Sequence, residues 1–537
     1  MKDNGVDMIK GARAAFMKSQ SNLSVNQLLN AAASSHPDKE VIVDGKVRMT
    51  YKELEKEANL LASGLSMLGI GEGDRVAAGL PNWYEIVVIY FALAKIGAIL
   101  VPFNYRLRMA EAEYILRNSG AKALFLPEEF DRLNQYEQFI NIKNHLSSLE
   151  YLLSVRFEKE NTISYQKLLE MGMQEEIDEI EIDSDNDIYT ILYTSGTTGK
   201  PKGAMLTHKN IVQTAVVTAD WMQCSSEDVF LMSMPLYHVM GINFLFRVIV
   251  SNASLILMDK YKPERALSLI ETEKVTVHPG VPTMFILELN HPMFSSFDLS
   301  SLRTGEIGGS SCPIEIVHRI RTEMNCNILV GYGLTETSPT LTLTDFEDDD
   351  TIRSETVGKP LPGVEIKIVD DFGNEIGKDK VGELVCRSFG VMKGYYAMHE
   401  KTREAIDGDG WFYTGDLAII DEEGYIRIIG RKQEVIKKAG FKIYPQEIEE
   451  IFLTHPNVAE AAMIGMPDSE VGEISYACLR LRRGSKNSEE ELKDFIKNKL
   501  ADYKVPDKII FMEHFPRTAT GKIRKIDLQC QIKSVIL

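Results

Sequence analysis

The stretch ILYTSGTTGKPKGAML, residues 191–206, concentrates the residue types that hold phosphate groups. An apolar lead-in runs into three glycines, four Ser or Thr hydroxyls and two lysines, and apolar residues then resume. Glycine lets the backbone curl close to a phosphate, so that several N–H groups donate to its oxygens. Lys200 and Lys202 add positive charge. The pattern predicts a phosphate-binding loop behind a buried strand, and the apolar flanks disfavour a plain surface loop.

The spacing of this loop differs from the Walker A pattern GxxxxGK[ST]. Gly196 is followed after two residues by Gly199 and Lys200, and then by Pro201, which lacks an N–H donor. A P-loop kinase or ATPase is therefore disfavoured. The same residue types still fit another class of nucleotide-binding protein.

The amino-acid composition indicates which classes of protein the chain can belong to. The chain has 537 residues, 44% of them hydrophobic and 26% charged, which is typical of a globular protein with two or more domains. The net charge is 60 − 78 = −18, and such an acidic surface repels phosphate backbones, so no nucleic acid partner is expected. Six cysteines without a CxxC pair favour reduced thiols and a cytoplasmic location.

One apolar segment, residues 86–103, approaches the length of a transmembrane helix. Lys95 lies in its middle, Gly97 interrupts it and Pro102 ends it. A buried helix followed by a strand is favoured over a membrane span. The N-terminus has no long apolar core, so no signal peptide is expected.

Helical and strand patterns alternate over the first 300 or so residues, which predicts α/β layers. Residues 51–69 have apolar side chains at helical spacing, and residues 123–127 and 253–259 are typical of buried strands. From about residue 360 the pattern is β-rich, with a hairpin turn at Gly373–Asn374. From about 445 helices and strands indicate a small separate α+β domain, with Ser488 and Glu491 forming a capping box.

The loop is similar to the signature loop of the adenylate-forming superfamily, which comprises acyl-CoA synthetases, adenylation domains and luciferases. Five further motifs resemble those of the family: PFNYRL (102–107), GYGLTET (331–337), WFYTGD (411–416), GRKQEVIK (430–437) and PRTATGKIRK (516–525). The resemblance spans roughly residues 40 to 525 and is strongest to fatty acid:CoA ligases.

The resemblance implies an α/β fold with a large N-terminal AMP-binding domain over residues 1–430. A β-rich subdomain occupies about 355–430 of it. A hinge over 431–434 joins it to a small, mobile C-terminal α+β domain, residues 435–537, which carries the catalytic lysine.

The resemblance also assigns roles around the triphosphate of ATP. Residues of the first loop would contact the phosphates: Thr194, Ser195, Gly196, Thr197, Thr198, Gly199 and Lys202. Glu336 would be the Mg²⁺ ligand, which fits the preference of Mg²⁺ for one carboxylate plus phosphate oxygens. Thr335 would lie near the α-phosphate, and Tyr332 would stack on adenine.

Further roles concern adenine, ribose and the reacting groups. Gly308, Gly309 and Ser310 resemble the segment that lines both adenine and the acyl tunnel, although the family usually has Gly-Ala-Pro there. Asp416 would accept hydrogen bonds from both ribose hydroxyls, and Arg431 would support the same ribose.

Lys522 would be catalytic, offsetting the repulsion between the carboxylate and the α-phosphate. His238 would gate the acyl site, against the alternative of a purely structural histidine. Gly440 has no side chain, so it would let the pantetheine arm of coenzyme A lie close to the backbone. Gln433 departs from the usual Asp or Lys of the family at the hinge.

The function implied is an ATP-dependent carboxylic acid:CoA ligase that forms acyl-AMP and pyrophosphate, then acyl-CoA and AMP. Its co-substrates are ATP with Mg²⁺ and coenzyme A. Val239, Met240, Ile242 and Phe244 indicate an apolar acyl pocket and so a medium- to long-chain fatty acid. Arg247 and Arg303 would suit a dicarboxylate, and Asn243 an aromatic acid.

Three alternatives stay open on these residues. They are an aryl-CoA ligase, a stand-alone adenylation enzyme that loads a carrier protein, and a non-catalytic sensor on the same scaffold. A small-molecule acid is the expected partner in the first two. Peripheral membrane association and a homodimer are further expectations.

Overall fold

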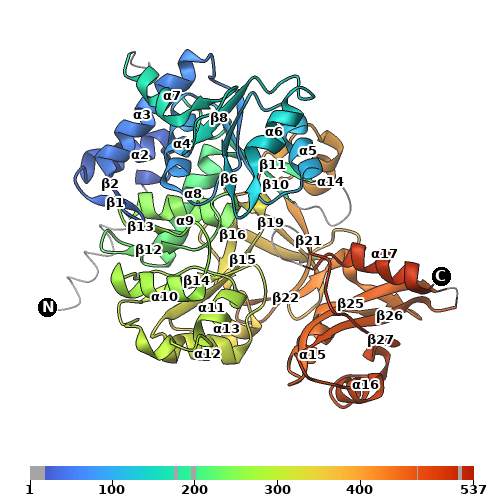
Figure 1. Ribbon diagram of the computed structural model, residues 1–537. Coiled ribbons are helices and arrows are strands. Elements are labelled where there is room, and N and C mark those ends of the chain that lie inside the picture. The colour runs from blue at the N-terminus through green and yellow to red at the C-terminus, as the bar shows by residue number, and fades with distance from the viewer. Residues whose placement is uncertain (1–18, 175–179, 195–200, 469, 518–522, 537) are drawn as a thin grey trace. The chain divides into compact units, whose positions relative to one another are not determined.

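The computed structural model describes residues 19–174, 180–194, 201–468, 470–517 and 523–536. The chain forms two compact units, whose elements are labelled in Figure 1. Among the described residues, the larger unit comprises 19–174, 180–194, 201–365 and 387–412, and the smaller unit comprises 366–386, 413–468, 470–517 and 523–536. The predicted α/β class with a large N-terminal part and a smaller C-terminal part is confirmed.

An eight-stranded sheet lies at the centre of the first half of the larger unit. Its order is β20 (Gly394–Tyr395), β11 (Lys202–Thr207), β10 (Ile188–Thr194), β4 (Ile99–Pro102), β3 (Arg75–Ala78), β5 (Ala123–Pro127), β8 (Tyr151–Val155) and β9 (Ile163–Ser164). The strands from β10 to β9 pair in parallel, whereas β11 is antiparallel to both of its neighbours. This order places β20 beside the strand that follows the phosphate-loop segment.

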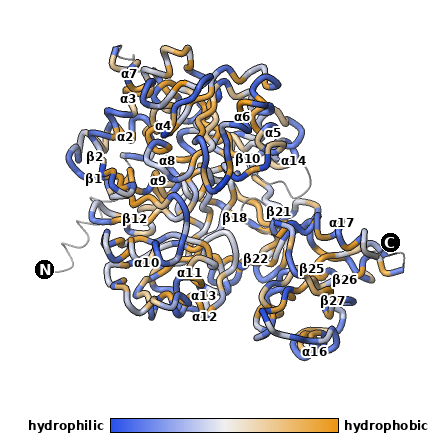
Figure 2. The backbone as a smooth tube through the Cα atoms, in the orientation of Figure 1, coloured by the Kyte–Doolittle hydropathy of each residue, from blue (hydrophilic) through white to orange (hydrophobic). Residues whose placement is uncertain are grey.

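Helices accompany this sheet, among them α3 (Tyr51–Met67), α4 (Tyr84–Lys95), α5 (Met109–Ser119), α6 (Gln135–Lys143), α7 (Tyr165–Gly172) and α8 (His208–Trp221). The helix expected over residues 51–69 is therefore present, and Gly69 follows it with a positive φ of 74°. The segment 86–103 forms most of α4, followed by β4, and every residue from Glu85 to Lys95 is buried. Among the described residues no helix is long and apolar enough to cross a membrane; Figure 2 shows the hydropathy along these elements.

The second half of the larger unit contains two four-stranded sheets. One has the order β12 (Val229–Met232), β13 (Ser254–Leu257), β1 (Glu40–Asp44) and β2 (Val47–Thr50). The other has the order β14 (Thr304–Ile307), β15 (Asn327–Gly333), β16 (Thr340–Leu343) and β17 (Lys359–Pro360). Bridges from Val277 to Phe230 and to Thr304 connect them.

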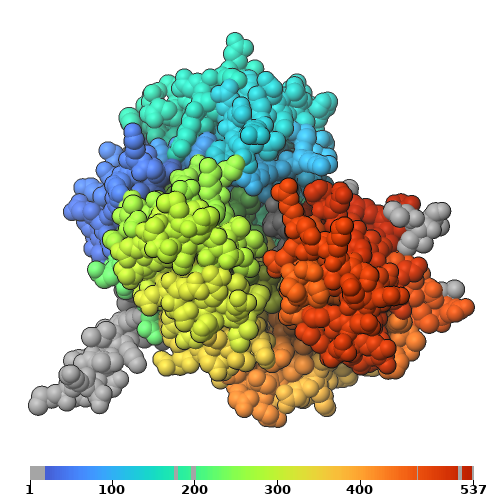
Figure 3. Space-filling model, turned by 60° about the horizontal axis from the view of Figure 1, so that its bottom comes forward, coloured from blue at the N-terminus to red at the C-terminus, as the bar shows by residue number. Residues whose placement is uncertain are grey.

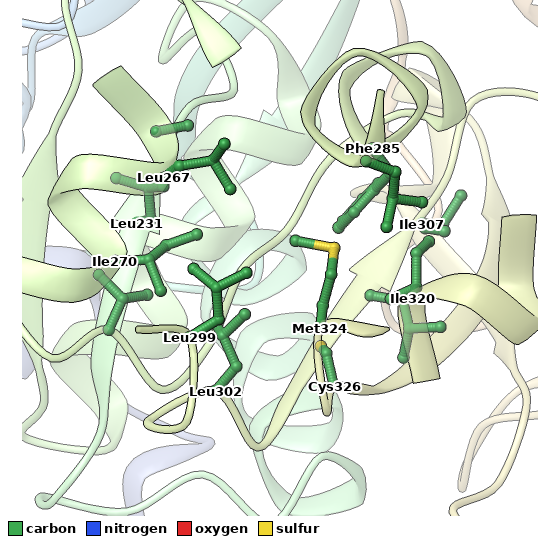
Figure 4. Close-up of a cluster of buried hydrophobic side chains, with 14 of the residues drawn as sticks. Leu231, Leu267, Ile270, Phe285, Leu299, Leu302, Ile307, Ile320, Met324 and Cys326 are labelled. Atoms are coloured by element: carbon green, nitrogen blue, oxygen red, sulfur yellow. The ribbon is translucent and has the colours of Figure 1, made fainter. Parts of the chain in front are cut away.

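A hydrophobic core supports these strands on one side. Figure 4 shows Phe285 and Ile307 close to Ile320, with Met324 and Cys326 beside them. These side chains come from β14, from α11 (Pro282–Leu289), from α12 (Ile314–Glu323) and from the segment that follows α12, and α10 (Pro263–Thr272) adds Leu267 and Ile270. The side chain of Ile307 therefore faces this core. Side chains alternate along a strand, so Glu306 and Gly308 face the other way.

The smaller unit has two sheets. The first has the order β18 (Glu365–Val369), β19 (Gly382–Arg387), β21 (Phe412–Ile420) and β22 (Ile426–Arg431). The second contains β24 (Phe441–Ile443), β23 (Ile436–Lys438), β26 (Gly472–Leu481) and β25 (Val458–Asp468), and β27 (Lys508–Phe511) pairs with β26. Figure 3 draws the residues of this second sheet in orange-red to red.

In the described part of this unit, α-helices span α15 (Pro445–Leu453), α16 (Glu489–Lys497) and α17 (Lys525–Ile536). Pro445 occupies the first turn of α15, and the capping box of Ser488 and Glu491 is present at α16, as the sequence predicts.

Candidate active site

The two ends of the phosphate-loop segment are held together as a β-hairpin. Thr194 ends β10 and pairs with Lys202, the first residue of β11. The Thr194 hydroxyl donates to the Lys202 carbonyl at 3.4 Å. Residues Ser195, Gly196, Thr197, Thr198 and Gly199 lie outside the described residues. The structure therefore places the start and end of the predicted loop, at one end of the central sheet.

Lys202, Tyr395 and Glu336 meet beside this hairpin. The Lys202 ammonium lies 4.1 Å from the centre of the Tyr395 ring, and the Tyr395 hydroxyl donates to Glu336 Oε1 at 2.8 Å. Glu336 is 8% exposed. Burial lowers the pKa of Lys202, and the nearby Glu336 carboxylate counteracts part of that effect. Sequence reasoning missed Tyr395, because only the pairing of β20 with β11 brings it here.

The backbone around Glu336 forms a tight turn. A short 3-10 helix spans Thr335–Thr337, and Ser338 adopts a left-handed φ of 64°. The Thr337 hydroxyl lies within hydrogen-bond distance of the carbonyls of Leu334 and Pro339, and the Met392 N–H donates to the Glu336 carbonyl at 2.9 Å. A Cβ at Gly333 would lie 1.4 Å from the Pro339 carbonyl oxygen, so this tight turn requires glycine. Thr335 and Tyr332 are half-buried beside it.

These residues fit a magnesium ion held with ATP. Among the residues that the structure describes, no group of three or more His, Cys, Asp or Glu side chains gathers as a metal cage. One buried carboxylate at Glu336 beside a lysine is the pattern that Mg²⁺ shares with phosphate oxygens. When bound, Mg²⁺ would neutralise charge on the triphosphate. Glu336 would hold it, and Lys202 would face the phosphates.

A second group of predicted residues surrounds the start of α9 (Val239–Val250). His238 is the N-cap of this helix, and its Nδ1 accepts the Met240 N–H at 3.3 Å. A Cβ at Gly308 would lie 3.2 Å from Met240 Cε, so the glycine segment and the helix are in contact. Gly309 has φ +84°, and Ser310 is exposed. The end of β14 and the start of α9 are thus brought together.

Asp416 and Arg431 form an ion pair in the smaller unit. They are direct partners on β21 and β22, and Arg431 Nε lies 2.8 Å from Asp416 Oδ1. The Asp416 side chain is 5% exposed and that of Arg431 is 42% exposed. The Asp416 N–H donates to the Thr414 hydroxyl, and the Gly415 N–H donates to Glu383 Oε1. The carboxylate is therefore buried beside its partner, whereas the guanidinium is partly exposed.

Gly440 lies in a different part of the smaller unit, in the turn between β23 and β24. It has φ +84°, and an added Cβ would meet nothing within 4 Å, so its conformation rather than its space calls for glycine. Gln433 is exposed in a 3-10 turn spanning Lys432–Glu434.

Lys522 lies outside the described residues, but both sides of its segment are fixed. Arg517 and Ile523 form an antiparallel bridge, and the Arg524 N–H donates to the Pro516 carbonyl at 2.8 Å. Lys525 is paired with Glu434 at 2.5 Å and with Glu449 at 2.7 Å. The predicted catalytic segment is therefore tied to the turn that contains Gln433.

Two family models match the chain. The model described as "AMP-binding enzyme" matches residues 29–396, and "AMP-binding enzyme C-terminal domain" matches residues 447–522. The chain belongs to the AMP-binding enzyme family. The predicted enzyme class, an AMP-forming acid–thiol ligase that uses ATP, Mg²⁺ and CoA, is thereby confirmed. The family identity excludes none of the possible acids.

Similar proteins cover nearly the whole chain. YngI of Bacillus subtilis is 38% identical over 94% of this chain and 96% of its own length. Medium-chain acyl-CoA ligase ACSF2 of Bos taurus is 35% identical over 96% of this chain and 88% of its own. The solved anthranilate CoA ligase AuaEII with anthranoyl-AMP has a TM-score of 0.85 at 28% identity, covering 95% of this chain and 97% of its own.

Proposed function

We propose that this AMP-binding enzyme converts medium- to long-chain fatty acids to acyl-CoA thioesters, with the residues above in their predicted roles. The observation that supports the proposal is that the polar side chains near the acyl site are paired with other residues of the protein. Arg247, Arg303 and Asn243 are the candidates for binding a charged or polar group on the acid. Each of these side chains already has hydrogen-bond or ion-pair partners inside the protein.

Arg247 is fully buried and paired with Glu306, with its Nη1 2.5 Å from Glu306 Oε2. Asn243 accepts from Arg247 Nε at 2.6 Å and donates to the Ser338 carbonyl at 3.2 Å. Arg303 pairs with Asp228 through two hydrogen bonds of 2.8 Å. A second carboxylate on the substrate would compete with these internal partners, whereas an alkyl chain needs none of them.

Each residue is proposed to act on one of the charged groups that react. The acid carboxylate attacks the α-phosphate of ATP, the bond from that phosphorus to the bridging oxygen breaks, and pyrophosphate leaves. Lys522 offsets the repulsion between the two anions, and Lys202 faces the leaving phosphates. Asp416 and Arg431 orient the ribose. The CoA thiol then attacks the acyl carbon, its proton is released, and AMP leaves.

The experiment that tests the proposal is ATP-dependent pyrophosphate release on a panel of acids from acetate to stearate, with benzoate-type acids added. Each acid is assayed with and without CoA, and products are identified by mass. Release that peaks on alkyl acids and multiplies with CoA, with acyl-CoA as product, supports the proposal. A peak on aromatic acids would make the protein an aryl-CoA ligase. Release indifferent to CoA would indicate a carrier protein as acceptor.

Location and assembly complete the proposal. All six cysteines are free, five of them buried, which favours a reducing compartment such as the cytoplasm. Loose membrane association follows from the partition of fatty substrates into bilayers, and a homodimer stays a prediction. Vesicle flotation and sedimentation measure these two properties.

Replacing Lys202 by arginine will raise the pH at which ATP binding begins to weaken. Burial lowers the pKa of Lys202, so its ammonium loses its proton at a lower pH than an exposed lysine does. The KM for ATP of the wild type will therefore rise as the pH increases through that lowered pKa. Arginine stays protonated throughout this titration, so the variant will show no such rise. Lys209→Arg at an exposed ion pair is the control and will keep the wild-type profile.

Replacing Gln433 by proline will spare acyl-AMP formation and stop thioester formation. The small domain must rotate between the two half-reactions, and proline removes the backbone freedom of a hinge residue. Pyrophosphate exchange and acyl-CoA synthesis are measured separately on the same preparation. Equal loss of both half-reactions would contradict the hinge assignment.

A further inference from the structure

Tyr395 contacts two oppositely charged groups of the candidate active site. Its side chain is 4% exposed, with the Lys202 ammonium over the face of the ring, 4.1 Å from its centre. The Glu336 carboxylate accepts from the hydroxyl at the edge of the same ring, at 2.8 Å. Among the described residues no hydrogen bond or ion pair joins Lys202 directly to Glu336. The tyrosine therefore contacts both charges while they remain unpaired with each other.

The backbone on both sides of Tyr395 is fixed to β11, the strand that begins with the lysine. The two strands are antiparallel. The Lys393 N–H donates to the Met205 carbonyl at 2.9 Å, and the Tyr396 N–H donates to the Gly203 carbonyl at 2.8 Å. The position of the ring relative to the first residue of β11 is thus set by main-chain hydrogen bonds on either side of it.

The same segment also contacts the turn that carries Glu336. The Met392 N–H donates to the Glu336 carbonyl at 2.9 Å. On its other side the segment packs on α14 (His399–Ala405), where the Tyr395 N–H donates to the Thr402 hydroxyl at 2.9 Å. A Cβ at Gly394 would lie 2.6 Å from Thr402 Cγ2, so glycine permits this close approach. One short segment therefore connects both charged residues to a fixed aromatic ring.

A direct pair between the two charges would oppose ligand binding. Lysine and glutamate side chains have several rotatable bonds, and a charge-assisted hydrogen bond between them is stronger than a contact with a neutral group. The triphosphate needs the ammonium, and a magnesium ion needs the carboxylate. Each ligand would first have to break the pair. A neutral ring and hydroxyl give the same two charges partners that are easier to replace.

We propose that Tyr395 is a positioning residue that keeps Lys202 and Glu336 apart, so that each charge stays available to its own part of the magnesium–ATP complex. The proposal rests on the roles proposed above for Lys202 and Glu336. It makes no assumption about which acid the enzyme uses.

The test is the binding of ATP to the full chain in EDTA, without acid, measured by isothermal titration calorimetry. Tyr395→Leu removes the ring, so the direct pair forms and ATP affinity falls about tenfold or more. Adding Glu336→Gln to this variant removes the competing carboxylate and recovers most of the lost affinity. A general disturbance of the site would not be recovered by a change at Glu336, so the recovery identifies the separating role.

Two further variants serve as controls. Tyr395→Phe keeps a ring between the charges, so it will retain most of the ATP affinity that Tyr395→Leu loses. Tyr396→Leu removes the next tyrosine along the chain, which packs against the core of the central sheet, and it will bind ATP as the wild type does. Thermal unfolding shows whether each variant is folded.

Three outcomes decide the matter. A folded Tyr395→Leu variant with wild-type ATP affinity, or a loss that Glu336→Gln does not recover, would overturn the proposal. Should Tyr395→Leu not fold, Glu336→Gln alone decides, because with the ring in place it will raise ATP affinity less than about fivefold. A larger gain would mean that the carboxylate already competes for Lys202. Unchanged ATP affinity in Lys202→Ala would instead refute the role of Lys202 itself.

Discussion

Replacing Lys522 by alanine will lower acid-dependent pyrophosphate release by about 100- to 1,000-fold, the typical effect of removing one group that stabilises transition-state charge. The carboxylate and the α-phosphate are both anions, and the ammonium offsets their repulsion only while they react. The KM for ATP will change little. Initial rates of pyrophosphate release with a saturating alkyl acid measure the effect.

The rate of thioester formation distinguishes a loss of this role in adenylation from a general loss of enzyme activity. Supplied with preformed acyl-AMP and CoA, the Lys522→Ala variant will form acyl-CoA at close to the wild-type rate, because the anionic encounter has already occurred. Lys533→Ala, at an exposed lysine of α17, is the control and will leave both half-reactions unchanged. Unchanged pyrophosphate release by Lys522→Ala would remove the catalytic assignment and revive the sensor alternative.

Replacing Asp416 by alanine will raise the KM for ATP by at least about 100-fold. A carboxylate accepts from both ribose hydroxyls, and each hydrogen bond to a charged group contributes about 1.5–3 kcal/mol. The fold will tolerate the change, because the partner guanidinium of Arg431 is 42% exposed and stays solvated. Steady-state kinetics with ATP as the varied substrate measure the loss.

A substrate lacking the hydroxyls tests the contact itself. The wild type will bind 2′,3′-dideoxy-ATP about 100-fold more weakly than ATP. Asp416→Ala will bind the two nucleotides almost equally, because it lacks the carboxylate that the ribose hydroxyls would contact. Glu422→Ala, at an exposed residue between β21 and β22, will discriminate as the wild type does. Full discrimination by Asp416→Ala would exclude the ribose role.

Local features of the fold were determined by the sequence itself. Periodicity and capping residues predicted the helix over 51–69, the strand over 123–127 and the start of α16, because these depend on contacts within a few residues. Lys95, Gly97 and Pro102 distinguished α4 and β4 from a membrane span. The order of the motifs determined the family and the reaction class, since each motif is a contiguous segment.

The surroundings of each site residue were decided by the tertiary structure alone. Tyr395 reaches Glu336 only because β20 pairs with β11, a contact between strands almost 200 residues apart in the chain. Arg247 and Arg303 are equally polar in the sequence, yet their pairing with Glu306 and Asp228 engages both within the fold. Local composition carries no record of such long-range partners, because they are selected when separate elements pack together.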